Sequence, residues 1–262
     1  MKVPIRIVDA FAEKAFGGNS AGVCLLDAAI DESLMQKIAA EVNSAETAFL
    51  VGSGNRFRLR WFTPAVEIDL CGHATLASAH VLWTEKLVQG GETIRFDTNS
   101  GELTAKQLAD GWIQLDFPAI PSNPYENRDL ASAIGATPTL VAMTHHTIIA
   151  ELSSEQEVRE LKPDIAAILA LGVHGVIVTA KGADKYDFVS RFFAPAVGIN
   201  EDPVTGSAHC ALGPYWQKRL GQDTFVAYQA SARGGVMRVT VAGNRALLEG
   251  KAVTTLSGEM NF

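Results

Sequence analysis

The sequence predicts an α+β fold built from two similar halves. Strand-like segments come in runs rather than in strict alternation with helices, which disfavours a doubly wound parallel sheet. Residues 60–69 and residues 191–200, half a chain length later, are also identical at six of ten positions, including Ile68/Ile199, and each copy precedes a glycine and a helical segment. Three extra residues lie between the second copy and its glycine, Gly206, relative to the first copy and Gly72. Self-similarity of this kind is the sequence signature of a duplicated structure.

The first half reads as strands with two helices. Asp31 is placed to act as the N-cap of a helix on which Leu34, Ile38 and Val42 recur at four-residue spacing, the pattern of an amphipathic helix. Residues 74–87 are rich in alanine and leucine without glycine or proline, and predict a buried helix. Strands are expected at 5–11, 22–26, 47–51, 57–62, 93–96, 102–108 and 112–117.

The second half begins after a segment, 119–127, that carries two prolines and predicts the crossover between halves. Helices are expected near 130–134, 155–161, 164–171 and 207–220, and strands within 139–152 and at 176–180 and 187–193. A closing hairpin is expected from 236–241 and 245–255, around Gly243-Asn244. The predicted halves are residues 1–118, to which the C-terminal-most residues can be added by strand exchange, and residues 119–262.

Composition excludes several classes of function. The apolar fraction of 47% supports a packed core, and the net charge of −7 without Lys/Arg clusters disfavours binding to nucleic acid or to anionic membranes. There is no run of 18 apolar residues and no signal-peptide pattern at the N-terminus. The three widely spaced cysteines indicate a reducing compartment, so we expect a cytoplasmic protein. The six histidines form no recognisable ligand set, so no metal site is expected.

The repeat itself suggests an anion site. Each copy leads through a short loop into a helix whose first turn holds Gly72 or Gly206. Helix N-termini carry free N–H groups and the positive end of the helix dipole. If the halves are related by a pseudo-two-fold axis, the two helix starts face one cleft, which suits a carboxylate or a developing enolate.

Five side chains near these loops can carry chemistry, and each has a plainer alternative. Glu46 is either a surface turn residue or a desolvated carboxylate of raised pKa that shuttles a proton. Cys71 is either a low-pKa thiolate at a helix start or a small buried apolar residue. His73 is either an acid or a structural histidine, and Asp202 is either a functional acid or a turn residue. Ser207 lacks the setting of a nucleophile and is better suited to donate a hydrogen bond to an anion.

Four segments together resemble the PhzF-like (phenazine biosynthesis-like) family. These are IVDAFAEKAFGGNSAGVCLL, NSAETAFL, FTPAVEIDLCGHATLASAHVLW and RFFAPAVGINEDPVTGSAHCALGPYW, and they follow the family's order between residue 6 and about residue 216. The resemblance implies a diaminopimelate-epimerase-like fold, in which each half curls a sheet around a central helix and the active site lies between the halves.

The resemblance also implies roles for individual residues. Glu46 matches the family's proton-shuttling glutamate, while His73 and Asp202 match its assisting polar residues. The predicted substrate contacts are Asn19, Gly72, Gly206 and Ser207. The implied reaction moves a proton within a small carboxylate substrate, as in the isomerisation of trans-2,3-dihydro-3-hydroxyanthranilate. The family implies a homodimer that needs no metal or organic cofactor.

Two other functions stay open at this point. Related racemases use one cysteine from each half, and Cys71 matches the first of these, whereas Asp202–Thr205 contains no cysteine and Cys210 falls inside the following helix. An epimerase would therefore need Cys71 with another acid. The third hypothesis is a metabolite-binding protein that has kept the fold without the reaction.

Overall fold

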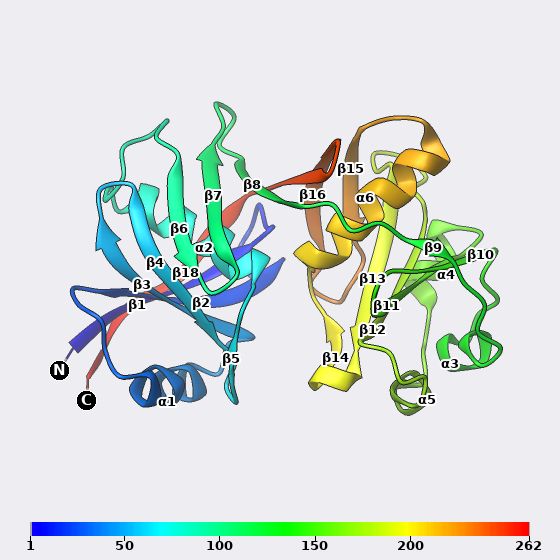
Figure 1. Ribbon diagram of the computed structural model, residues 1–262, viewed down its shortest axis with the longest axis horizontal. Helices are drawn as coiled ribbons and strands as arrows, with labels where there is room; N and C mark the ends of the chain where they lie inside the picture. Colours follow the sequence, from blue (N-terminus) through cyan, green and yellow to red (C-terminus); the bar gives the residue numbers. More distant parts are fainter. Residues whose placement is uncertain (1, 262) are drawn as a thin grey trace. The chain divides into compact units, whose positions relative to one another are not determined.

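The computed structural model describes residues 2–261, which divide into two compact units (Figure 1). The first unit contains residues 2–116 together with 249–261, and the second contains residues 117–248. The second unit ends at Leu248, and residues 249–261 belong to the first unit. The reason is that the last strand of the chain pairs antiparallel with the first strand (Figure 1).

The first unit is a sheet with one helix, α2, buried against it. Its elements are β1 (Lys2–Ala10), β2 (Asn19–Leu26), α1 (Glu32–Val42), β3 (Glu46–Ser53), β4 (Arg56–Phe62), β5 (Glu67–Ile68), α2 (Gly72–Thr84), β6 (Ile94–Thr98), β7 (Gly101–Gln107), β8 (Ile113–Pro118) and β18 (Ala252–Asn261). The strand order is β18–β1–β2–β3–β4–β6–β7–β8, with β5 added to the end of β4. Only β2/β3 and β4/β6 among these pairs are parallel.

The central position of α2 follows from its composition. Ten of its 13 residues are buried, and residues 72–84 contain no aspartate, glutamate, lysine or arginine. A helix that is apolar on all sides is stable only when it is covered all round, and α2 packs against β1, β2, β3 and β18. The predicted buried helix at 74–87 is thus confirmed, beginning and ending slightly earlier.

The second unit repeats this plan. Its elements are β9 (Asn123–Pro124), α3 (Leu130–Ile134), β10 (Leu140–Met143), β11 (Thr147–Glu151), α4 (Glu155–Glu160), α5 (Ile165–Ala170), β12 (Gly175–Lys181), β13 (Phe188–Ala194), the 3-10 turn η1 (Pro195–Val197), β14 (Ile199–Asp202), α6 (Gly206–Leu220), β15 (Thr224–Gln229), β16 (Gly235–Ala242) and β17 (Arg245–Gly250). The order is β9–β10–β11–β12–β13–β15–β16, with β11/β12 and β13/β15 parallel. Strand β15 was not predicted, and the predicted strand 245–255 is two strands, β17 and β18.

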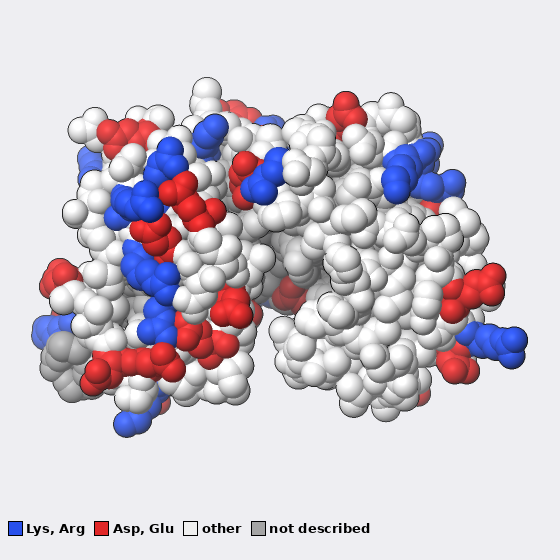
Figure 2. Space-filling model, in the orientation of Figure 1, with Lys and Arg blue, Asp and Glu red and all other residues white. Residues whose placement is uncertain are grey.

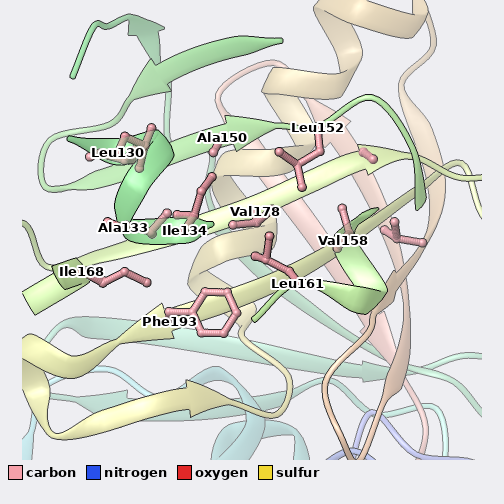
Figure 3. Packing of buried hydrophobic residues seen from close by; sticks show 14 residues of the cluster. Leu130, Ala133, Ile134, Ala150, Leu152, Val158, Leu161, Ile168, Val178 and Phe193 are labelled. Atoms are coloured by element: carbon pink, nitrogen blue, oxygen red, sulfur yellow. The ribbon is translucent and has the colours of Figure 1, made fainter. Parts of the chain in front are cut away.

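Two layers of helix cover the sheet of the second unit. On one face of β12, Val176 and Val178 pack with α3, α4 and α5 in an apolar cluster that includes Phe193 (Figure 3). On the other face, Thr179 Oγ1 accepts a hydrogen bond from Trp216 Nε1 of α6 at 3.0 Å. This division follows from the two-residue side-chain period of a strand.

A proline inside α6 ties the helix to the start of the unit. Pro214 lacks an N–H group, so the carbonyl of Cys210, four residues earlier, loses its intrahelical donor. The N–H of Ile120 donates to that carbonyl at 2.9 Å instead. The predicted crossover segment is thereby held along α6. Within residues 2–261, no helix combines the length and apolar character needed to span a membrane.

Matching ion pairs confirm that the two units are copies of one plan. Arg60 holds Glu67 through two hydrogen bonds of 2.6 Å each, and Arg191 holds Glu201 through bonds of 2.7 and 2.9 Å. Both guanidinium groups also lie over a phenylalanine ring of their own strand, at 5.2 and 5.0 Å from the centroid.

These pairs correct the alignment of the repeat. Because Glu67 is equivalent to Glu201, the three extra residues of the second copy lie inside the repeat, at residues 198–200, and not after it. The identity of Ile68 with Ile199 in the ungapped alignment is therefore fortuitous. Ile68 pairs with Trp61 as Asp202 pairs with Phe192, so Asp202 occupies the position of Ile68.

Basic and acidic side chains interleave on one face of the first unit (Figure 2). Arg56 lies 2.6 Å from Asp97 and 3.3 Å from Glu102, and Arg95 lies 2.5 Å from the same Glu102. Exposed pairs of this kind each contribute about 0–1 kcal/mol to stability. Their main consequence is that the charges on β4, β6 and β7 largely neutralise one another.

Candidate active site

Glu46 is the first residue of β3 and lies on the face that α2 covers. Ala21 of β2 pairs with Glu46 in parallel register, so their side chains share one face, and Asn19, two residues earlier on β2, shares it as well. Glu46 is 7% exposed and Asn19 is 1% exposed. The interpretation of Glu46 as a surface turn residue is therefore wrong.

The start of α2 brings two more functional groups to this face. Cys71 is the N-cap residue in extended conformation, and His73 is the second residue of the helix. Each is 6% exposed. The carbonyl of Cys71 accepts a hydrogen bond from Thr75 Oγ1 at 2.5 Å, which helps to hold the first turn in place.

Glu46, Cys71 and His73 form a compact cluster in the first unit. Glu46 Oε2 lies 3.0 Å from His73 Nε2. This oxygen is buried and has no hydrogen-bond partner, so the contact is an ion pair that is not aligned with a ring N–H bond. The Sγ atom of Cys71 lies 3.5 Å from Nδ1 and 4.0 Å from Nε2 of His73.

The charges of the cluster follow from burial and from these contacts. Burial raises the pKa of Glu46, but the charge of His73 and the contacts with His73 and Cys71 outweigh it, so the pKa of Glu46 lies below its ordinary value of 4.5. Burial lowers the pKa of His73, whereas Cys71 and Glu46 raise it, and the net pKa lies well above 6.5. Burial and the carboxylate of Glu46 raise the pKa of the Cys71 thiol above 9.0.

At neutral pH the cluster therefore holds a carboxylate, an imidazolium and a neutral thiol. Because the thiol keeps its proton, Glu46 is the group that stabilises the proton on His73. The pKa shifts in two of the alternatives are wrong: Glu46 does not have a raised pKa, and Cys71 is not a low-pKa thiolate. The first omitted the charge of His73, and the second omitted burial and the carboxylate of Glu46.

The loop before α6 in the second unit is held by a residue that the sequence did not reveal. Asp202 is the half-buried last residue of β14, and its carboxylate accepts a hydrogen bond from Thr205 Oγ1. Gln229 of β15 donates from Nε2 to the carbonyl of Asp202 at 2.7 Å, and its Oε1 accepts from the N–H of Thr205 at 2.9 Å. Gln229 lies outside every recognised motif, and only the unpredicted strand β15 brings it here.

Both helix starts leave backbone donors available. Neither Cys71 nor Thr205, the two N-cap residues, caps its helix through a side-chain hydrogen bond. The first N–H groups of a helix have no partner within the helix, and Gly72 and Gly206 place no side chain over them. Ser207, the second residue of α6, is exposed. Each start is therefore suited to bind a carboxylate group.

Glu46 has no counterpart in the second unit. Thr47, which follows Glu46, pairs with Phe62 of β4. Val176, which follows Gly175, pairs with Phe193 of β13. Phe62 and Phe193 are equivalent members of the repeat, so Gly175 occupies the position of Glu46.

The second unit also has no space for such a side chain. A Cβ atom at Gly175 would lie 2.7 Å from Phe192 Cε2 and 2.8 Å from the carbonyl oxygen of Phe193, closer than real contacts allow. At the helix starts, Thr205 stands where the first unit has Cys71. At these two pairs of equivalent positions, the carboxylate and the thiol both lie in the first unit.

The comparisons with known proteins agree with the motifs. A family model described as phenazine biosynthesis-like protein matches residues 8–258. The chain belongs to the phenazine biosynthesis-like family. Relatives cover nearly the whole of both chains: an uncharacterized isomerase of Pseudomonas aeruginosa is 48% identical over 100% of each chain, and one of Halalkalibacterium halodurans is 47% identical over 99% of each. The human phenazine biosynthesis-like domain-containing protein is 41% identical over 99% of each.

Solved structures confirm the fold. A PhzF-family protein of Enterococcus faecalis superimposes with a TM-score of 0.96 at 44% identity, covering 100% of both chains. A hydroxyproline epimerase of Agrobacterium vitis superimposes with a TM-score of 0.66 at 12% identity, covering 98% of this chain and 92% of that one, which shows likeness of fold alone. The phenazine biosynthesis-like chain therefore has the predicted diaminopimelate-epimerase-like fold, and it is an isomerase of this family.

Proposed function

We propose that the chain is a cofactor-independent isomerase that moves a proton within a small carboxylate substrate, with Glu46 as the acid/base. The observation that carries the proposal is the asymmetry of the two units. Glu46 is a buried carboxylate beside His73, whereas the equivalent Gly175 leaves no space for a base. One carboxylate must then both remove the proton and return it, which suits an allylic shift on one face of the substrate.

The charges of the cluster support this reaction. Glu46 is ionised at neutral pH, so it can accept a proton from an acidic C–H bond. The adjacent imidazolium of His73 can stabilise negative charge as it develops on the conjugated substrate. The protonated Glu46 then donates the same proton to another carbon, which regenerates the carboxylate.

Backbone donors supply the proposed binding of the substrate carboxylate. The uncapped start of α2 at Gly72 is next to His73 and offers N–H groups together with the positive end of the dipole. Gly206, Ser207 and Asp202 of the second unit enter the proposal as contacts that the family resemblance implies. In the same way, trans-2,3-dihydro-3-hydroxyanthranilate is the proposed model substrate.

The epimerase alternative has less support. It needs Cys71 as a thiolate and an acid on the opposite face, but burial and Glu46 favour the neutral thiol, and Thr205 stands at the equivalent position. A hydroxyl group of ordinary acidity is a poor partner for a two-base inversion.

The test is proton exchange by NMR in D₂O with a chelator present. The substrates are trans-2,3-dihydro-3-hydroxyanthranilate and a panel of small amino and keto acids. Glu46→Gln is expected to lose about 10²–10⁴-fold in rate, since positioned acid/base groups contribute this much. Glu41→Gln, which changes an exposed glutamate of α1, is the matched control and should retain the full rate.

The outcomes separate the hypotheses. Turnover that survives Glu46→Gln rules out the proposed mechanism. Exchange with stereochemical inversion that depends on Cys71 supports the epimerase, and binding with neither turnover nor exchange on any compound supports a metabolite-binding protein. The homodimer and the cytoplasmic location stay predictions, and light scattering during size-exclusion chromatography tests the first.

A further inference from the structure

Three different metal-ligating side chains meet in the first unit. The carboxylate of Glu46, the thiol of Cys71 and the imidazole of His73 each offer one ligand atom, and these atoms all lie within 4.8 Å of one another. They come from two elements, the start of β3 and the start of α2. We propose that this cluster binds one Zn²⁺ ion or another thiophilic divalent transition-metal ion, a site distinct in chemistry from the metal-free reaction above.

The spacing of the atoms is close to that of a tetrahedral site. Zinc bonds of about 2.0–2.3 Å place neighbouring ligand atoms roughly 3.3–3.8 Å apart. An ion bound by Nε2 of His73 would have Glu46 Oε2 at 3.0 Å and Cys71 Sγ at 4.0 Å from that nitrogen, and the three ligand atoms all lie within 4.8 Å of one another. Small shifts of these side chains would bring the three atoms to the spacing of a zinc site.

The state of the ligands also favours an ion. Glu46 Oε2 is buried and meets His73 only through an ion pair without an aligned hydrogen bond, so a metal ion could replace the proton of His73 as its cationic partner. Nitrogen, sulfur and oxygen are the donors that zinc takes from proteins, and three protein ligands leave a fourth position open. Each of the three residues keeps 6–7% of its surface exposed, so the cluster is not fully sealed.

Binding balances through protons. The ion replaces the proton of the Cys71 thiol and one proton of the His73 imidazolium ring, and both protons pass to the buffer. A bound ion would also inhibit the reaction, because it would coordinate the carboxylate of Glu46, the acid/base in the proposed function on which this step rests. No metal site was expected from the sequence, because the six histidines form no ligand set and this cluster contains a single histidine.

The test uses Co²⁺ as a spectroscopic substitute for Zn²⁺ and needs no substrate. Adding Co²⁺ to the metal-free protein should give one equivalent of bound ion, a sulfur-to-cobalt charge-transfer band in the near ultraviolet, and the strong visible bands of tetrahedral Co²⁺. Zn²⁺ should abolish these bands by displacement. Cys71→Ala should lose the charge-transfer band and weaken binding by more than about 10-fold, since even outer-shell partners are worth 10–100-fold.

The other two cysteines are matched controls. Cys24 and Cys210 are also buried and free, so Cys24→Ala and Cys210→Ala change the same group without touching the cluster, and both should keep the band. Glu46→Gln should keep the charge-transfer band with weaker binding. A wild-type protein that shows only the spectrum of hydrated Co²⁺, or a band that persists in Cys71→Ala, overturns the proposal. Neither result bears on whether the metal-free protein exchanges substrate protons.

Discussion

Gln229→Ala should destabilise the second unit, because this side chain holds the loop that carries Asp202. The amide makes three hydrogen bonds: it accepts from the N–H of Thr205 at 2.9 Å, and it donates to the carbonyl of Asp202 at 2.7 Å and to Thr205 Oγ1 at 3.2 Å. Gln229 is 1% exposed, so water does not replace the amide without rearrangement.

The magnitude follows from the groups that lose a partner. The N–H of Thr205 is buried, and leaving a buried donor unpaired costs about 1–3 kcal/mol. The carbonyl of Asp202 is half-buried and can recover part of its bond from water, so its loss adds about 0.5–1.5 kcal/mol. Thr205 Oγ1 still donates to Asp202 and adds little. The free energy of unfolding should therefore fall by about 2–4 kcal/mol.

Urea denaturation followed by fluorescence measures this difference. Gln217→Ala is the matched control, because Gln217 makes one hydrogen bond, to Asp223 at 2.8 Å, at an exposed position. Its effect should stay within about 0.5 kcal/mol, as for most surface substitutions. If Gln229→Ala costs no more than Gln217→Ala, the loop does not depend on the amide and the reasoning fails.

Three further predictions concern single groups. In metal-free buffer, Glu46→Gln should lower the pKa of His73, because burial then acts without the opposing charge of the carboxylate, and the histidine NMR signals measure this. The folded pKa of His73 is raised, so His73 contributes stability that is present below pH 6.5 and lost at higher pH. The folded pKa of Glu46 is lowered, so Glu46 contributes stability that is present above pH 4.5 and lost on acidification. The variant should therefore show a weaker dependence of the free energy of unfolding on pH in both directions. Gly175→Ala should cost about 1–3 kcal/mol through overpacking against Phe192, and a thermal midpoint equal to wild type contradicts this. Tyr215→Phe should lower the free energy of unfolding by about 1.5–3 kcal/mol, since the hydroxyl donates to the buried carboxylate of Glu151 at 2.5 Å. An unchanged denaturation midpoint would show that Arg219 alone is sufficient to stabilise this carboxylate.

Local patterns predicted most of the elements. The four-residue spacing of Leu34, Ile38 and Val42 correctly indicated α1, and the alanine-rich composition of residues 72–84 correctly indicated a helix buried on all sides. The strand β15 was missed although Thr224–Gln229 contains β-branched and aromatic residues and lies between Gly221 and Gly234. Its role depends on parallel pairing with β13, a contact between segments far apart in the chain.

The candidate site shows the same division. Glu46, His73 and Asp202 were identifiable from motifs, but their environments were not. The direction of the Glu46 pKa shift depends on a histidine 27 positions away in the chain that lies 3.0 Å from it in space. Gln229 lies in no motif, and it reaches the loop because Ser190 of β13 pairs with it in β15.

The sequence by itself determined the duplication, the α+β class, the family resemblance and the identity of the chemically active side chains, because motifs and periodicity are properties of neighbouring residues. The tertiary structure decided where those side chains stand and what charge they carry. The parallel pairing of β2 with β3 directs Glu46 at the start of α2, and the packing of Phe192 leaves Gly175 no room for a second base. Burial, ion pairing and steric exclusion act between residues that only folding brings together, which is why only one of the two similar halves holds a buried carboxylate at this position.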